Sequence, residues 1–75
     1  MMYRRIKEMR EDSDFTQKDV AAYLQVSRTA YSGYENGHRG VPTEVLCLLA
    51  DFYGTSVDYL LGRTDERKPY PPVSR

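Results

Sequence analysis

The sequence predicts an all-α fold in which five short helices form one domain over residues 1–62, followed by a proline-containing segment over residues 63–75. Apolar side chains recur at the helical spacing of about 3.6 residues, and residues that favour helix ends separate these stretches. No alternating run rich in Val, Ile and Thr is long enough for a strand. At 75 residues, the chain forms one domain with a small core.

The first predicted helix runs from about Met2 to Glu11. One side of it carries Ile6, Met9 and Arg10. The Asp-Ser-Asp sequence over residues 12–14 ends it. A second helix begins after Thr16, because Thr16 and Asp19 have the spacing of a capping box, with Asp in place of the usual Glu. The inward side of this second helix consists of Val20, Ala21 and Leu24.

A third helix follows after a very tight connection, Gln25-Val26. Ser27 is a good N-cap for this helix, because a serine hydroxyl accepts a hydrogen bond from a free backbone N–H in the first turn. The inward positions are Ala30, Tyr31 and Tyr34. The Asn36-Gly37 pair closes the helix.

Two further helices are expected after residues 37–42, whose glycines and proline prevent regular structure. Thr43 is expected to cap the fourth helix. The inward side of this helix consists of Leu46, Leu49, Ala50 and Tyr53. Ser56 is expected to cap a short fifth helix over residues 57–61. A glycine directly follows each of these helices and ends it.

The formal charge is balanced, with 11 basic and 11 acidic residues, so the net charge gives no overall attraction to nucleic acid. Residues 1–40 carry a net charge of +1, residues 41–62 carry −3 and residues 63–75 carry +2. A surface that binds nucleic acid therefore has to come from residues 1–40, with help from the last segment. We expect this last segment to be a flexible tail that extends as polyproline, because it contains Pro69, Pro71 and Pro72.

The composition argues against several classes of protein. No apolar run approaches the ~20 residues of a membrane span, and the basic start lacks the apolar stretch of a secretory signal, so we expect a cytoplasmic protein. The single Cys47 lies in an apolar run and is expected to be buried. No nucleophile–base arrangement, metal-binding motif or glycine-rich phosphate loop is visible. We therefore expect no enzyme, no cofactor and no metal.

The second and third predicted helices indicate a function. Two helices of similar length joined by about three residues cannot form a relaxed hairpin, so small residues must lie where their axes cross. Ala21 and Ala30 meet this need. The geometry exposes residues 27–29, Ser-Arg-Thr, at the start of the third helix, where they are available to a groove of DNA.

Five short motifs occur in an order and at a spacing typical of one protein family. They are TQKDVAAYL (16–24), VSR (26–28), YENG (34–37), LA (49–50) and SVDYLLG (56–62). These motifs resemble the Cro/C1-type helix-turn-helix family of phage repressors and xenobiotic-response-element-type bacterial regulators. The resemblance covers residues 3–62 and implies a lambda-repressor-like DNA-binding domain. In such a domain the second and third helices form the helix-turn-helix, and the third helix reads the major groove.

The resemblance also implies which residues contact DNA. Base contacts fall on Arg28, Thr29, Ser32 and Gly33. Phosphate contacts fall on Gln17, Ser27, Asn36, His38 and Arg39. The fork of Arg28 pairs with guanine O6 and N7, with a phosphate contact as the alternative. Gln17 binds phosphate at a helix N-terminus or is only solvated there. Asn36 is alternatively only a C-cap, and His38 only a solvated loop residue.

In relatives an acidic residue at the position of Glu35 pairs with a basic residue of the first helix, here Arg10. We therefore expect Arg10 and Glu35 to form a partly buried structural pair. Two positions depart from the family pattern. Gln25 occupies the turn position where glycine is commonest, so it is left-handed or the turn differs. Gly33 replaces a base-reading side chain, which allows close approach of the backbone to DNA or means fewer base contacts.

The last predicted helix carries more apolar groups than it can bury on one side, and the resemblance implies that some of them form a two-fold homodimer interface. The candidates are Val57, Tyr59, Leu60 and Leu61. The alternative is that Leu60 and Leu61 only close the core of the monomer. A dimer would place two recognition helices about 34 Å apart, which matches a palindromic operator. Such a dimer would act by steric competition with the transcription machinery.

A protein-interaction module or an antitoxin on the same scaffold is the alternative to a DNA-binding regulator, since a fold does not fix a function. The zero net charge and Gly33 favour this alternative. The joint presence of Gln17, Arg28 and Asn36 favours DNA binding. We therefore predict a sequence-specific transcriptional regulator, a repressor, that binds double-stranded DNA without a small-molecule ligand.

Overall fold

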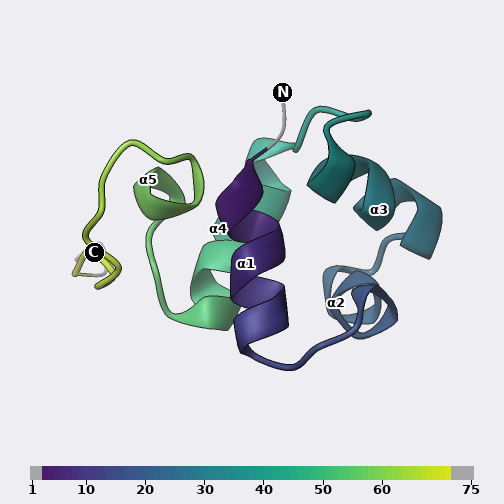
Figure 1. The fold of residues 1–75 in the computed structure, drawn as a ribbon, viewed down its shortest axis with the longest axis horizontal. Coiled ribbons are helices and arrows are strands. Elements are labelled where there is room, and N and C mark those ends of the chain that lie inside the picture. The colour runs from purple at the N-terminus through teal and green to yellow at the C-terminus, as the bar shows by residue number, and fades with distance from the viewer. Residues whose placement is uncertain (1–2, 72–75) are drawn as a thin grey trace.

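A computed structural model describes residues 3–71, and over this range the chain forms five α-helices and no strand. The helices are α1 (Arg4–Asp12), α2 (Gln17–Leu24), α3 (Arg28–Asn36), α4 (Thr43–Tyr53) and α5 (Val57–Leu60). The all-α prediction is confirmed for these residues. Met2 and Pro72, which the sequence analysis placed in the first helix and the tail, lie outside the described residues. In Figure 1, α2 and α3 lie at one end of the molecule, α5 lies at the other, and α1 and α4 lie between them.

Hydroxyl caps start α2, α3 and α5 as predicted. The Thr16 hydroxyl accepts a hydrogen bond from the backbone N–H of Asp19 at 3.0 Å, and the Asp19 carboxylate accepts one from the backbone N–H of Thr16 at 2.9 Å. Hydrogen bonding of Thr16 to the Asp19 carboxylate, by its backbone N–H above all and also by its side chain, holds the pKa of Asp19 below its ordinary value. Ser27 and Ser56 cap α3 and α5 through their hydroxyl oxygens. The predicted helix starts are therefore confirmed at these three places.

The start of α4 and the end of α5 differ from the prediction. Pro42 takes the N-cap position of α4 without a side-chain hydrogen bond, and Thr43 is the first helical residue. Proline fits this position because the N-cap residue is extended, and the φ of −60° that Pro42 adopts is the value that the proline ring imposes. Helix α5 ends at Leu60, one residue earlier than expected. Gly54 adopts a positive φ angle directly after α4, and Gly62 adopts one two residues after the end of α5, which lets the chain turn away.

The core is small and draws on all five helices. Its members are Ile6, Met9, Val20, Ala21, Leu24, Tyr31, Tyr34, Val45, Leu46, Leu49, Ala50 and Leu60. Ala30 and Tyr53, which were expected to face inward, are only half-buried. Cys47 is exposed, contrary to the prediction. The buried positions of α4 follow the helical repeat, and this repeat turns Cys47 and Leu48 outward despite their apolar neighbours.

Residues 63–71 fold back onto the helices, although the sequence suggested a free tail. The Thr55 hydroxyl donates to the carbonyl oxygen of Arg67 at 2.7 Å, and the Tyr70 hydroxyl donates to the Asp58 carboxylate at 2.6 Å. The guanidinium of Arg5 donates to the carbonyl oxygen of Tyr59 at 2.9 Å and to the carbonyl oxygen of Thr64, which belongs to this segment. Polar side chains of α1, of α5 and of the turn before α5 thus hold this segment by hydrogen bonds. The proline content of the segment did not predict these hydrogen bonds.

Candidate nucleic-acid interface

A three-residue turn sets the angle between α2 and α3. Gln25 adopts a left-handed conformation, with φ 59° and ψ 40°. This conformation costs a non-glycine residue about 1 kcal/mol. The backbone N–H groups of Gln25 and Val26 donate to the carbonyl oxygens of Ala22 and Ala21, at 3.2 and 3.1 Å, and close the end of α2. Ala21 is 3% exposed, so its small side chain allows close packing where the chain reverses. As a result α3 starts directly after α2, with its first turn exposed.

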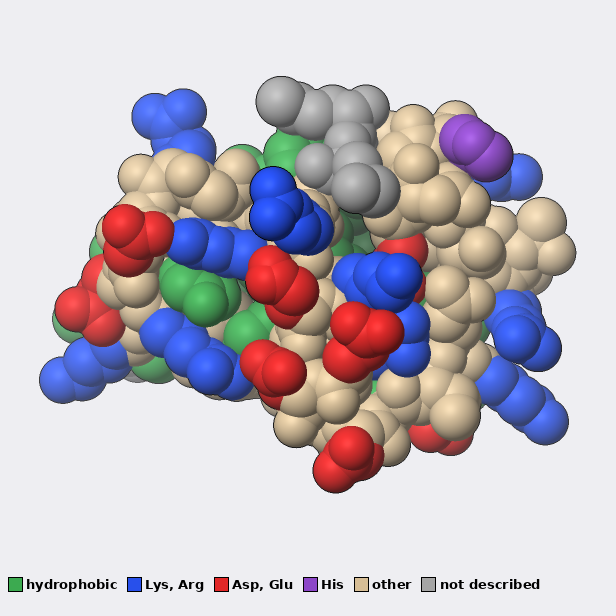
Figure 2. Space-filling model, in the orientation of Figure 1, with side chains coloured by type: hydrophobic (Ala, Val, Ile, Leu, Met, Phe, Trp, Pro, Cys, Tyr) green, Lys and Arg blue, Asp and Glu red, His purple; other side chains and the backbone are tan. Residues whose placement is uncertain are grey.

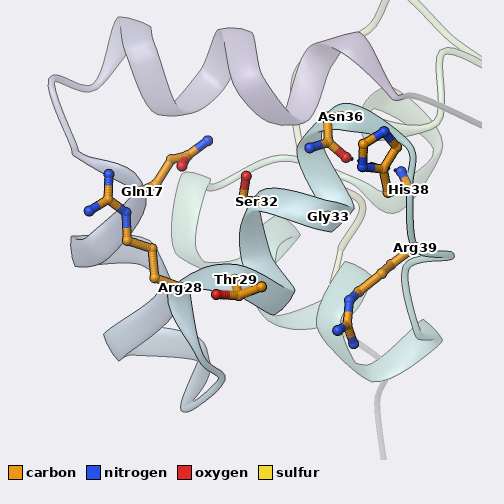
Figure 3. A pocket seen from close by; sticks show the side chains of 8 residues that line it. All are labelled: Gln17, Arg28, Thr29, Ser32, Gly33, Asn36, His38 and Arg39. Atoms are coloured by element: carbon orange, nitrogen blue, oxygen red, sulfur yellow. Dashed lines mark hydrogen bonds between the residues drawn. The ribbon is translucent and has the colours of Figure 1, made fainter.

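The exposed side of α3 forms one wall of a shallow hollow of about 410 Å³. The residues that line it are Gln17, Arg28, Thr29, Ser32, Gly33, Asn36, His38 and Arg39. Figure 3 shows these side chains grouped around α3, from the start of α2 to the loop after α3. None of the eight is acidic and two are arginines. The hollow therefore brings together every residue predicted to contact a base or a phosphate, except Ser27.

Charges are unevenly placed on the face drawn in Figure 2. Lys and Arg side chains extend from the edge formed by α2 and α3 with few acidic side chains beside them, whereas over the middle and the opposite end Lys and Arg are mixed with Asp and Glu. This arrangement explains how a chain with no net charge can still present a surface that attracts an anion.

Gln17 begins α2, but its side chain turns partly inward. Its Nε2 donates to Glu35 Oε1 at 3.1 Å, and the side chain is half-buried. One amide hydrogen is thus used within the protein, while the other and the free backbone N–H groups of the first turn of α2 remain available. The sequence did not indicate this inward hydrogen bond.

Asn36 and Ser27 also have structural partners. Asn36 Oδ1 accepts from the backbone N–H of His38 at 3.0 Å, so Asn36 shapes the loop that follows α3. The Ser27 hydroxyl accepts from the backbone N–H of Ala30 at 3.0 Å. The Asn36 amide group and the Ser27 hydroxyl hydrogen remain able to donate, so each residue combines a capping role with donors directed outward.

Arg10 and Glu35 lie together behind the hollow. Arg10 Nε is 2.6 Å and Nη2 3.1 Å from the two carboxylate oxygens of Glu35. The Tyr31 hydroxyl donates to Glu35 Oε2 at 2.5 Å, and Gln17 donates to Oε1. The side chain of Glu35 is 3% exposed and that of Arg10 is 12% exposed. This cluster joins α1, α2 and α3, and therefore holds α3 in a fixed position on the domain.

Protonation of Glu35 is opposed by its partners. Burial alone raises the pKa of this carboxyl, but the hydrogen bonds from Arg10, Tyr31 and Gln17 outweigh burial and hold the pKa below its ordinary value. The bond to Glu35 likewise raises the pKa of Arg10. The folded state therefore keeps both groups charged at neutral pH.

We expect the contribution of Glu35 to stability to be complete above about pH 5 and to be lost as the pH falls through its lowered native pKa. The reason is that the unfolded chain binds this proton more readily than the folded chain. Urea unfolding between about pH 7 and pH 3 measures the effect. The free energy of unfolding should depend less on pH in the variant Glu35→Gln than in the wild type. Parallel profiles for the two proteins would contradict this assignment.

Gly33 is buried, although it lies on the outward side of α3. A Cβ atom at this position would lie 2.8 Å from both Cγ and Cδ of Arg39. The expected base contact of Gly33 is therefore not available in this arrangement, because the Arg39 side chain covers the glycine.

Lys7 was missed by the sequence analysis. It lines a smaller hollow of about 210 Å³, together with Gln17, Ser32, Glu35 and Asn36. The signal was present, because Lys7 precedes Arg10 by three residues on α1 and therefore shares one side of that helix.

The fold and this site define a class of protein: an all-α domain whose second and third helices form a helix-turn-helix with the start of the third helix exposed. The helix-turn-helix family model matches residues 6–60. The chain belongs to the Cro/C1-type helix-turn-helix family. It is a family of DNA-binding regulators and not of enzymes.

Three similar proteins illustrate the family. The chain is 35% identical over 75 residues to the uncharacterized HTH-type transcriptional regulator YobD of Bacillus subtilis, covering 100% of this chain and 65% of YobD. It is 34% identical over 67 residues to the regulator AnsR of the same organism, covering 89% of this chain and 58% of AnsR. It is 30% identical over 69 residues to the antitoxin PezA of Streptococcus pneumoniae, covering 92% of this chain and 44% of PezA. The chain thus spans less than two thirds of the length of these relatives.

Over residues 3–71, no helix is long and apolar enough to cross a membrane. In the same range no three His, Cys, Asp or Glu side chains are grouped so that they could hold a metal ion.

Proposed function

We propose that this protein binds double-stranded DNA sequence-specifically and represses transcription, with α3 in the major groove. The observation that carries the proposal is the hollow along α3, which contains two arginines and no acidic residue. A helix-turn-helix places the start of its second helix against base edges, and Arg28 and Thr29 occupy this position. The similarity to transcriptional regulators such as YobD and AnsR supports the same function.

The contacts divide into two groups. Arg28 pairs with guanine, Thr29 contacts a base through its methyl or hydroxyl group, and Ser32 lies one turn further along the same side of α3. The phosphate backbone is held on either side of α3 by Gln17, Ser27, Asn36 and His38. The hydrogen bonds that already fix Gln17, Ser27 and Asn36 within the protein would place their free donors before DNA arrives.

Self-association through α5 is part of the proposal. Val57, Tyr59 and Leu61 are half-buried in the monomer and have surface left for a partner. Leu60 is 1% exposed and belongs to the core, so it is removed from the expected interface. The Arg5 guanidinium covers one face of the Tyr59 ring, with Cζ 4.1 Å from the ring centre. A partner would therefore contact the rest of the Tyr59 side chain. A two-fold dimer of this kind would bind a palindromic operator and exclude the transcription machinery.

A second candidate function is that of an antitoxin, which acts by binding a protein. The similarity to the antitoxin PezA, at 30% identity over 69 residues, supports it. The two candidates differ in what they require of α3. A regulator needs Arg28 to discriminate between bases, whereas a protein-binding module does not.

Selection of bound sequences from a random duplex library tests the proposal. We expect a palindromic consensus with half-sites about 10 base pairs apart. The variant Arg28→Ala should bind this consensus about 1–3 kcal/mol more weakly, because the lost fork no longer pairs with guanine. The matched control is Arg63→Ala, which removes an arginine that is 73% exposed and whose ion-pair partner, Asp58, lies on α5. Absence of enrichment, with weak binding that does not depend on Arg28, would favour the protein-binding module.

A further inference from the structure

The side chain of Arg39 occupies the space that a side chain at position 33 would fill. A Cβ atom on Gly33 would lie 2.8 Å from Arg39 Cγ, 2.8 Å from Cδ and 3.3 Å from Nε. Non-bonded carbon atoms approach favourably only to about 3.5–4.0 Å. Any residue other than glycine at position 33 is therefore incompatible with the present position of Arg39.

The backbone fixes Arg39 at the same place. Its N–H donates to the carbonyl oxygen of Gly33 at 3.1 Å. The loop reaches this point because Gly37 is left-handed, with φ 83°, and because Asn36 Oδ1 accepts from the N–H of His38. Both the main chain and the side-chain stem of Arg39 are thus held against Gly33, on the outward side of α3.

The charged end of Arg39 is free to bind. Arg39 is exposed, and among residues 3–71 its guanidinium has no acidic partner within ion-pairing distance. Gly33 lies one turn beyond Thr29 on the same side of α3. Figure 3 shows the side chains of Arg28 and Arg39 on opposite sides of Thr29. The guanidinium groups of Arg28 and Arg39 therefore belong to the same hollow, along the side of α3 that carries Thr29 and Gly33.

We propose that Arg39 is a base-reading residue, which pairs with guanine in the major groove and replaces the side chain that is absent at position 33. This inference rests on the proposed function. The side of a recognition helix that faces the groove meets base edges, whereas its flanks meet phosphates. The Arg39 stem packs against α3 at Gly33, on the side that carries Thr29, and its planar fork matches guanine O6 and N7. The arrangement thus reassigns Arg39 from the phosphate contact that the family resemblance implied.

The test starts from the operator that the wild-type protein selects from a random duplex library. We expect Arg39→Lys to lose its preference at one base pair by about 5- to 150-fold, because lysine keeps the charge but not the fork. Preferences at the other base pairs, and the salt dependence of binding to random DNA, should stay unchanged. The control Arg63→Lys, made at an arginine outside the hollow, should change no preference.

A second variant tests the coupling between the two residues. Gly33→Ala should weaken the same preference, since its Cβ displaces the Arg39 stem, and it should not destabilise the fold because alanine is a better helix former than glycine. In the background of Arg39→Ala, Gly33→Ala should have no further effect on this preference. Gly40→Ala is the matched control, because a Cβ there meets no atom within 4 Å and the φ of Gly40 is not positive.

The outcomes separate this inference from the proposed function. A wild-type protein that selects no sequence rejects the proposed function before any variant is made. A wild-type operator whose base preferences all survive Arg39→Lys and Gly33→Ala overturns the role of Arg39 alone. Uniform weakening of all sequences by Arg39→Ala, with a salt slope reduced by about 1, would assign Arg39 to a phosphate.

Discussion

We expect Glu35→Ala to lower the free energy of unfolding by about 3–5 kcal/mol. The loss is large because the side chain of Glu35 is 3% exposed and three groups bind its carboxylate. Without it, the largely buried guanidinium of Arg10 loses its ion-pair partner and keeps only the carbonyl oxygen of Phe15, and the Tyr31 hydroxyl and the Gln17 amide lose their acceptor. Urea denaturation followed by circular dichroism measures the change. Because the cluster joins α1, α2 and α3, the variant should also bind the selected operator more weakly.

Two comparisons show whether this loss comes from the buried pair. Glu11→Ala removes an exposed carboxylate from the same region of α1, and its effect should stay within about 0.5 kcal/mol. The double variant Arg10→Ala, Glu35→Ala should lose less free energy of unfolding than the two single variants together. In the double variant both members of the pair are absent, so no charged group is left without its partner. A loss below about 1 kcal/mol for Glu35→Ala would be typical of an exposed ion pair and would contradict our description of the site.

Leu60→Ala should destabilise the monomer by about 3 kcal/mol, within the usual range for a buried leucine. Leu60 is 1% exposed and contributes the buried side chain of α5, so truncation leaves a cavity in the core. Thermal unfolding at several protein concentrations measures this loss. Because the lost contacts lie within one chain, the difference from the wild type should be the same at every concentration.

The neighbouring variant Leu61→Ala provides the contrast. Leu61 is half-buried and follows the last helical residue, so its truncation should cost the monomer less than that of Leu60. If α5 mediates self-association, Leu61→Ala should weaken the dimer in sedimentation experiments while leaving the folded monomer intact. If Leu60→Ala left the stability of the monomer unchanged, the Leu60 side chain would not be buried in the core, contrary to its place in this structure.

Local signals made the helices predictable from the sequence. The capping box of Thr16 and Asp19 and the serine cap of α3 are made by residues close together in the chain, so their spacing determines the contact. The left-handed turn at Gln25 was one of two possibilities that the family pattern left open. The apolar repeat likewise identified most of the core, because a helix that buries one side must repeat that side.

The remaining features depend on contacts that spacing does not encode. The cover of Gly33 by Arg39 depends on the path of a loop, and the inward hydrogen bond of Gln17 depends on how α2 and α3 cross. Leu60 and Leu61 differ by about 100° of rotation on a helix, and sequence alone could not decide which of them faces the core. In each case the tertiary arrangement decides between positions that the local pattern treats as equivalent.

The location of residues 63–71 determines how the protein is best attached to a surface. Hydrogen bonds of Thr55 and Asp58 hold this segment beside α5, at the end of the molecule opposite α3. A linker or dye attached within residues 63–71 therefore lies far from α3. Immobilisation through that end would leave α3 facing the solution. Coupling through side-chain amines would instead modify Lys7, which lines the smaller hollow beside α3, and Lys18, which lies in the first turn of α2.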